Sequence, residues 1–178
     1  MTEAELSKLE FNAQRLIETY FRGKKDKGNV DYLCHLCAVA DGIEKKGELA
    51  GSEYNMDVRI FYKRAYIVAL LHDILEDTDC PEQELRNAGC DDDIIEAIKS
   101  VTRREDEQYY FDFIKRANKN PMGRIVKICD LENNMDIKRL KKFGDYEMKR
   151  LKKYWYSWKY LKGEITEKEV EKEINSYK

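Results

Sequence analysis

Residues that break helices are scarce in this chain. Only two prolines and nine glycines occur among its 178 residues, so few segments contain anything that forces a helix to end. A half-buried strand shows alternating apolar and polar residues and is bounded by turn residues, and no stretch of this sequence has that pattern. The sequence therefore predicts an all-α protein, folded as an orthogonal bundle of helices.

Apolar residues recur at helical spacing along most of the chain, as Leu6, Leu9, Ala13 and Ile17 illustrate. Loops are predicted at 22–30 and 47–57. Helices are predicted at 4–22, 31–46, 59–77, 81–89, 91–101, 106–118, 121–137, 145–162 and 166–177. Asp31 is the predicted N-cap of the second of these helices.

Length and charge narrow the class of protein. The length predicts a single domain over 1–178, with a core at about 20–140 and C-terminal helices at 145–177. The 33 basic and 35 acidic residues nearly cancel, so no overall field attracts nucleic acid or an anionic membrane. No stretch reaches the roughly 18 apolar residues of a membrane span. The expected partner is a small molecule, bound by a monomer or a homodimer.

The five cysteines form no disulfide framework. Cys34 and Cys37 make one C-x-x-C pair, but no second pair completes a zinc ribbon. Most of the cysteines are expected to be small buried apolar residues. A reducing compartment fits this pattern, and we expect a cytoplasmic protein.

Four ionisable residues follow a strongly apolar run. His72, Asp73, Glu76 and Asp77 come directly after Leu70 and Leu71. On a helix, residues three and four apart share a face, which would place these groups on one ridge. Burying them without partners costs several kcal/mol, and a divalent cation bound by histidine and aspartate offsets that cost. The alternative is a solvated helix end.

Only two histidines are present, so a site with two histidine ligands must use His35 and His72. His35 lies in an otherwise apolar helix. A lone histidine there is more often a hydrogen-bonded core residue than a metal ligand. However, His72 is a second buried histidine, and the carboxylate of Asp73 stands next to it in the sequence. This pair needs a further partner, which favours a metal site that includes His35.

A third segment carries Lys127, Asp130 and Asn134 on one helical face. Asp130 follows apolar residues and is expected to point inward, where it needs a cation or several donors. Lys127 or Arg124 can stabilise phosphate oxygens. The alternative is an ordinary amphipathic helix with Asp130 at its boundary.

These segments resemble a known family. His35, then His72-Asp73, then Asp130 resembles the H…HD…D signature of the HD-domain metal-dependent phosphohydrolases. Residues 69–78, ALLHDILEDT, resemble the HDxxEDT segment of the Rel/SpoT-type alarmone hydrolases. Segments 28–40 and 126–135 resemble the first and third motifs of the same family, and the resemblance covers about residues 20–140.

The resemblance implies a fold, a metal and a reaction. It implies an HD-type bundle that binds one metal ion, usually manganese, although zinc, iron, nickel or magnesium are possible. The implied metal ligands are His35, His72, Asp73 and Asp130. The implied reaction removes the 3'-pyrophosphate from a guanosine alarmone such as ppGpp.

The resemblance also assigns roles around the metal. Glu76 and Asp77 would orient or deprotonate the attacking water. Asn134 would contact the ribose or a phosphate, and Lys24 and Lys25 fall near the family's base-packing Arg-Lys pair.

The departures from the family fall on the substrate side. Segment 28–32 lacks the usual proline and has one extra residue, Leu36 replaces a common proline, and Leu131 replaces a frequent arginine. Segment 44–57 lengthens the chain between the two histidines. Two alternatives to alarmone hydrolysis therefore stay open. The chain could hydrolyse a different nucleotide or phosphorylated metabolite, or it could be a non-catalytic regulator that binds a nucleotide.

Residues 149–162, KRLKKYWYSWKYLK, interleave lysines with aromatic residues. Such a pattern can bind single-stranded nucleic acid. We favour an amphipathic helix whose stripe of Leu151, Trp155, Trp158 and Leu161 faces the protein body. A contact with another subunit is a third interpretation.

Overall fold

The computed structural model describes residues 1–26, 28–52 and 55–174. The helices are α1 (Glu3–Tyr20), α2 (Tyr32–Leu49), α3 (Met56–Leu71), α4 (Ile74–Asp77), α5 (Glu82–Ala88), α6 (Asp92–Val101), α7 (Tyr110–Lys119), α8 (Pro121–Asn134), the 3-10 helix η1 (Ile137–Arg139), α9 (Asp145–Leu161) and α10 (Glu167–Ile174). Within these described ranges no strand forms, and one isolated bridge pairs Lys25 with Asp31. The all-α prediction is confirmed.

Local capping explains several helix ends. The side chain of Asp31 accepts a hydrogen bond from the backbone N–H of Leu33, so the predicted N-cap of α2 is confirmed. Gly89 ends α5 at φ 107°, a left-handed conformation that favours glycine. Asn120 caps α8 by accepting from the N–H of Gly123.

The predicted helix at 59–77 is wrong at both ends. It begins earlier, at Met56, because the side chain of Asn55 accepts from the N–H groups of the first turn. It is also interrupted after Leu71, and α4 starts only at Ile74. The interruption turns the chain at His72 and Asp73, so the four ionisable residues of this segment do not form one continuous ridge.

Other predicted boundaries shift by a few residues. The predicted helix at 106–118 begins only at Tyr110, and the one at 121–137 ends at Asn134 before η1. Part of the loop predicted at 47–57 is helical, since α2 continues to Leu49. The end of the helix predicted at 166–177 lies outside the described residues.

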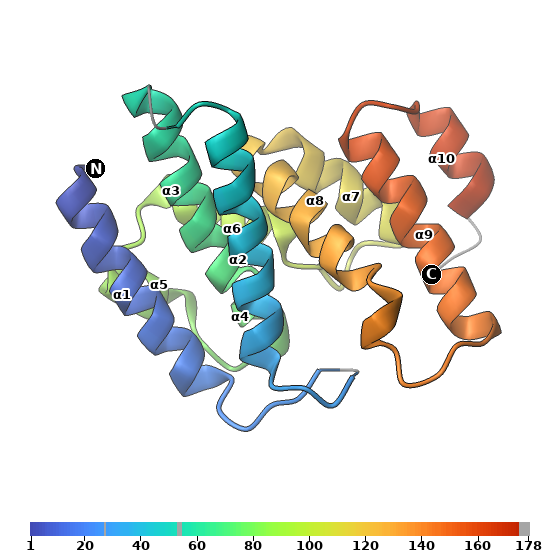
Figure 1. Cartoon of the computed structure of the whole chain (residues 1–178), viewed down its shortest axis with the longest axis horizontal. Helices are drawn as coiled ribbons and strands as arrows, with labels where there is room; N and C mark the ends of the chain where they lie inside the picture. Colours follow the sequence, from blue (N-terminus) through green and yellow to red (C-terminus); the bar gives the residue numbers. More distant parts are fainter. Residues whose placement is uncertain (27, 53–54, 175–178) are drawn as a thin grey trace.

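The hydrophobic core consists of two clusters that meet at α8. The first is formed mainly by α1 to α6 and includes Val126 and Cys129 of α8. The second is formed by α7, α9 and α10 and includes Leu131 of α8. Figure 1 shows α8 between α2 and α3 on one side and α7 and α9 on the other. Asp130 therefore lies on the helix that joins the two halves.

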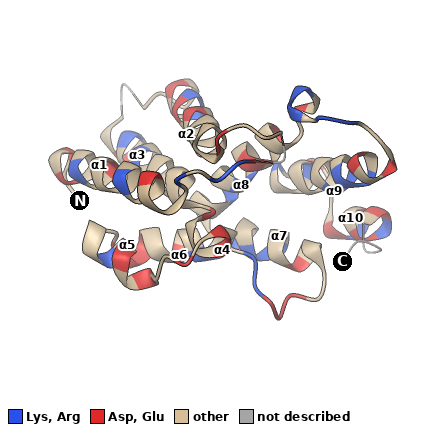
Figure 2. Ribbon diagram, turned by 90° about the horizontal axis from the view of Figure 1, so that it is seen from below, with Lys and Arg blue, Asp and Glu red and all other residues tan. Residues whose placement is uncertain are grey.

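The connection from α8 to α9 is rich in basic residues. Lys138, Arg139, Lys141 and Lys142 follow one another closely there, and the segment is blue in Figure 2. Lys141 and Lys142 are exposed, whereas Arg139 is partly buried. Arg139 thus differs from its neighbours in pointing toward the protein.

The predicted apolar stripe of α9 is partly wrong. Leu161 is fully buried, and Trp158 packs on the second cluster and donates to Glu132 at 3.0 Å. Trp155, however, is 45% exposed. The inward face of α9 passes through Ser157 and Leu161, one helical turn apart, and this face leaves Trp155 at its edge.

The cysteine prediction is confirmed, because Cys80, Cys90 and Cys129 are buried while Cys34 and Cys37 are exposed. None of the described helices has the length and apolar character that crossing a bilayer requires.

Candidate metal centre

The two histidines meet in the protein interior. His35 comes from α2 and His72 from the turn after α3, and their ring centroids are 5.2 Å apart. His72 Nδ1 lies 2.7 Å from the carbonyl oxygen of Ala69. A carbonyl only accepts, so Nδ1 donates, and in the neutral ring Nε2 keeps its lone pair. His72 Nε2 is buried and makes no hydrogen bond with any described residue.

Two carboxylates face the same pair of Nε2 atoms. Asp73 Oδ2 lies 3.1 Å from Nε2 of His72 and 3.6 Å from Nε2 of His35. Asp130 Oδ1 lies 3.7 Å and 3.4 Å from the same two atoms. One ligand atom each from His35, His72 and Asp73 fall within 4.8 Å of one another. The fold thus brings together four side chains that the sequence analysis selected from three distant segments.

Asp130 is tied to its own helix on its other side. Its Oδ2 accepts from Lys127 Nζ at 2.7 Å, and its Oδ1 accepts from the Asn134 amide. Burial opposes ionisation, but the ammonium of Lys127 and the two imidazoles hold the pKa of Asp130 well below its usual value. Asp130 is therefore ionised at neutral pH. The expected shared face of Lys127, Asp130 and Asn134 is confirmed.

The site favours positive charge at the imidazoles. Burial lowers the pKa of both rings, but the carboxylates of Asp130 and Asp73 outweigh it and raise the pKa of His35 to about 9. Asp73 and Asp130 likewise raise the pKa of His72 to about 10. A divalent cation supplies the same positive charge between these groups.

The hydroxyl of Tyr32 faces two carboxylates but has only one proton to donate. It lies 2.7 Å from Asp73 Oδ2 and 2.6 Å from Asp77 Oδ2. One hydroxyl has one proton, so it donates to one of these carboxylates at a time. When the two imidazoles are neutral, the lone pairs on their Nε2 atoms add to this surplus of acceptors, and a divalent metal ion satisfies all of these acceptors.

Glu76 and Asp77 extend from α4 into the same space. Glu76 Oε2 accepts from the backbone N–H of Arg103 at 2.8 Å. Glu76 is open to the cavity, yet the protein around it desolvates the carboxyl and raises its pKa. Both carboxylates line the cavity beside Asp73. They are placed to exchange protons with a molecule held there.

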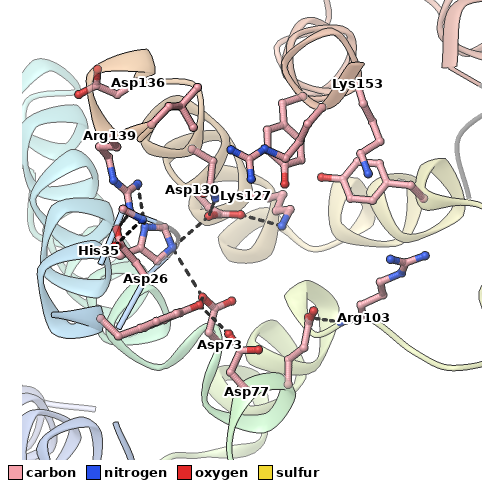
Figure 3. Close-up of a pocket in the computed structure, with 18 of the residues that line it drawn as sticks. Asp26, His35, Asp73, Asp77, Arg103, Lys127, Asp130, Asp136, Arg139 and Lys153 are labelled. Atoms are coloured by element: carbon pink, nitrogen blue, oxygen red, sulfur yellow. Dashed lines mark hydrogen bonds and ion pairs between the residues drawn. The ribbon is translucent and has the colours of Figure 1, made fainter. Parts of the chain in front are cut away.

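The metal centre opens into a cavity of about 690 Å³, a volume typical of small-molecule sites. Four basic residues line the side formed by α9 and the segment after α6; we call Arg103, Lys149, Arg150 and Lys153 the basic wall. Figure 3 shows Lys153 and Arg103 across the cavity from His35. Tyr110, Tyr146 and Tyr154 also line the cavity.

The basic wall has few acidic neighbours. Within the described part of the chain, the side chains of Arg103, Lys149 and Arg150 make no ion pair, and Arg150 Nε is buried without a hydrogen bond. Lys153 Nζ lies 4.2 Å from the ring centroid of Tyr110. By contrast, the partly buried cation Arg64 is paired with Asp91 at 2.8 Å. Positive charge is thus directed into the cavity.

The predicted substrate residues lie in different positions. Lys25, Lys127 and Asn134 line the cavity, although Lys127 is held by Asp130. Lys24 donates to the carbonyl of Asp77 and does not line the cavity. Arg124 donates to the carbonyl of Leu161, also away from the cavity.

Sequence reasoning missed Arg139 and the whole basic wall. Lys149, Arg150, Lys153 and Tyr154 share a helical face by their spacing, which is a readable signal. The sequence favours an amphipathic helix for that segment, with nucleic-acid binding and a subunit contact as the alternatives, and none of these places the basic residues at the substrate cavity. The spacing marks a face but does not say that a cavity lies in front of it.

Comparisons with known proteins bear on the fold. No family model matches this chain, and no curated protein matches its sequence. Among solved structures, the chain is similar to a metazoan orthologue of SpoT that hydrolyses ppGpp and plays a role in starvation responses. The TM-score is 0.65 at 16% sequence identity, over 97% of this chain and 96% of that one. The predicted HD-type helical fold is confirmed.

Proposed function

We propose that this chain is a metal-dependent phosphohydrolase that removes the 3'-pyrophosphate of a guanosine alarmone such as ppGpp. The observation that carries the proposal is the convergence of two imidazole Nε2 atoms and two carboxylates at one end of a cavity whose other side is basic. The structural similarity to a ppGpp hydrolase supports the choice of substrate.

The proposed metal ligands are His35, His72, Asp73 and Asp130. Nitrogen and carboxylate donors suit manganese, zinc and iron, and we propose manganese as the native ion. When bound, such an ion lowers the pKa of water and neutralises charge that develops on a phosphoryl group.

The chain's own residues carry the proton transfers in this proposal. Glu76 or Asp77 accepts a proton from the attacking water, whose oxygen forms a bond to the phosphorus attached to the 3'-oxygen. The bond between that phosphorus and the 3'-oxygen breaks, and the oxygen takes up a proton. Water and ppGpp thus give GDP and pyrophosphate. Tyr32 holds Asp77 in place through the 2.6 Å contact.

Other residues of the cavity bind the substrate in this proposal. The basic wall attracts phosphate groups that are distant from the reacting phosphorus, because Arg103, Lys149 and Arg150 make no ion pair with the described residues. Asn134 contacts the ribose or a phosphate. Lys25 and Lys127 complete the proposed contacts. Lys24, which donates to the Asp77 carbonyl and does not line the cavity, has no substrate contact in this proposal.

The test is hydrolysis by the purified protein. With Mn²⁺ the protein is expected to release pyrophosphate from ppGpp, and Asp73→Asn is expected to abolish the release. Asp79→Asn is the matched control, since Asp79 is exposed and does not line the cavity. Unchanged activity in Asp73→Asn would refute the proposed site.

Two alternatives share the same cavity. Hydrolysis of other nucleotides or phosphorylated metabolites, with ppGpp untouched, would change the substrate but keep the metal centre. Tight binding of ppGpp without turnover under any divalent metal would indicate a regulator instead. A single domain, a cytoplasmic location and a monomeric or homodimeric state stay predictions.

A further inference from the structure

Behind His35, on the side away from the cavity's basic wall, lie two residues with no role in the function proposed above. Asn133 Oδ1 is 2.8 Å from His35 Nδ1. The guanidinium of Arg139 donates to the same Oδ1 and to the backbone carbonyl of Asn133, the latter at 3.0 Å. Figure 3 shows Arg139 next to His35.

Donor and acceptor types fix the polarity of these contacts. A guanidinium has only donors, so the Asn133 atom that faces Arg139 must be the amide oxygen. That oxygen also faces His35, and an oxygen acceptor requires Nδ1 to carry the proton. Arg139 Nη1 is 3.5 Å from His35 Nδ1, a separation that two donors sharing one acceptor adopt. In the neutral ring the lone pair is then on Nε2, the atom that faces Asp73 and Asp130.

Arg139 is itself held from the opposite side. Its Nη2 lies 2.6 Å from Asp26 Oδ2. The other oxygen of Asp26 accepts from the backbone N–H groups of Gly28 and Val30, at 2.9 Å each. A Cβ on Gly28 would lie 2.8 Å from the Arg139 carbonyl, so only glycine allows this approach. Arg139 is therefore fixed between the segment before α2 and the end of α8.

We propose that Asn133 and Arg139 are positioning residues that hold His35 with Nδ1 protonated and Nε2 directed at the metal ion. Arg139 fixes the orientation of the Asn133 amide, and the amide fixes the tautomer and the ring angle of His35. Such outer contacts orient the ligands of many metal sites. The inference rests on the metal centre proposed above and adds residues that the sequence analysis did not select.

Nitrogen-15 NMR of the histidine rings tests this proposal directly. The chain has only two histidines, so two imidazole spin systems are expected and assignment is simple. In the protein loaded with Zn²⁺, a diamagnetic probe, His35 is expected to show a protonated, hydrogen-bonded Nδ1 and a metal-bound Nε2. Metal bound to Nδ1 of His35 in the unaltered protein would overturn the proposal without any variant.

Substitutions then separate positioning from general stability. Asn133→Ala is expected to change the His35 resonances and to weaken Zn²⁺ binding by about 10- to 100-fold. Asn133→Asp keeps an acceptor oxygen and is expected to restore most of the affinity. At saturating Zn²⁺ the His72 resonances are an internal control for folding, because that ring bonds to the Ala69 carbonyl and not to Asn133.

Arg139→Gln is expected to have a smaller effect of the same kind, since it frees the Asn133 amide to rotate. Lys141→Gln is the matched control in the same basic segment and is expected to bind Zn²⁺ as the unaltered protein does. Equal Zn²⁺ affinity and equal His35 resonances in all four variants would overturn the proposal while the metal centre stands. Failure of the unaltered protein to bind Zn²⁺ or Mn²⁺ would overturn both.

Discussion

The two sides of the cavity differ in how their charges are compensated. We call the side of the cavity formed by His35, His72, Asp73 and Asp130 the metal half. These four side chains are largely buried, and each contacts groups of opposite charge or hydrogen-bond partners. On the basic wall, Arg103, Lys149 and Arg150 make no ion pair within the described residues. Changes in the metal half should therefore alter stability and metal binding together. Changes on the basic wall should alter only substrate affinity.

Asp130→Asn is expected to have the largest effect. It removes the negative charge between the buried ammonium of Lys127 and two imidazoles, and losing one partner of a buried ion pair costs about 3 to 5 kcal/mol. Denaturant unfolding should show this loss, and a titration should show that Mn²⁺ binding is lost as well. Arg150→Gln, the comparison variant on the basic wall, should keep the free energy of unfolding within about 0.5 kcal/mol. Equal losses in both variants would erase the contrast between the two sides.

Glu76→Gln is expected to lower the rate by about 10²- to 10⁴-fold, the usual contribution of a general base. Burial raises the pKa of Glu76 above the ordinary 4.5 of a glutamate. The carboxylate is the active form, so activity should be present above the raised pKa and fall as the pH drops through it. The pH profile of kcat/KM should lose this acid limb in Glu76→Gln and keep it in Asp77→Asn. An unchanged limb in Glu76→Gln would assign the base elsewhere.

Removing charge from the basic wall is expected to give a moderate effect. The double variant Lys149→Gln with Arg150→Gln should raise KM for ppGpp by about tenfold with little change in kcat, as expected when uniform binding is lost. High salt should reduce the difference, because exposed charges are screened. Lys142→Gln, which lies outside the cavity lining, is the control. A fall in kcat with constant KM would instead place these cations at the reacting phosphate.

The smallest effect is expected at Trp155. This side chain is 45% exposed, and we found the sequence-based assignment of it to the buried stripe to be wrong. Trp155→Ser should change the free energy of unfolding by less than about 0.5 kcal/mol, whereas Trp158→Ser should cost several times more because it also loses the bond to Glu132. Equal stability losses of the two variants in thermal unfolding would support the original prediction that Trp155 faces the protein body. A concentration-dependent change in mass would point to a subunit contact.

The contrast between the two sides also explains what the sequence could predict. The metal half was predictable because its ligands fall in short local motifs and because only two histidines exist. The break of the helix at His72 and Asp73 was not predictable, because the apolar run of α3 continues without interruption to Leu71. At this turn the ring of His72 bonds back to the carbonyl of Ala69, a contact that no sequence pattern indicates.

The basic wall and Arg139 depend on tertiary packing. Helical spacing marks a basic face on α9, but only the packing of α9 against α7 and α8 directs that face into the cavity. Arg139 meets Asp26 across 113 residues of sequence, and no local pattern in either segment indicates the contact. Contacts of this kind can be found only once the fold is known.

The most direct test of the account is anomalous diffraction from a crystal grown with Mn²⁺. We expect one strong anomalous peak per chain, in contact with Nε2 of His35, Nε2 of His72 and the carboxylates of Asp73 and Asp130. A structure with no peak there, or with the two imidazoles turned away from each other, would contradict the metal centre and the hydrolytic function built on it.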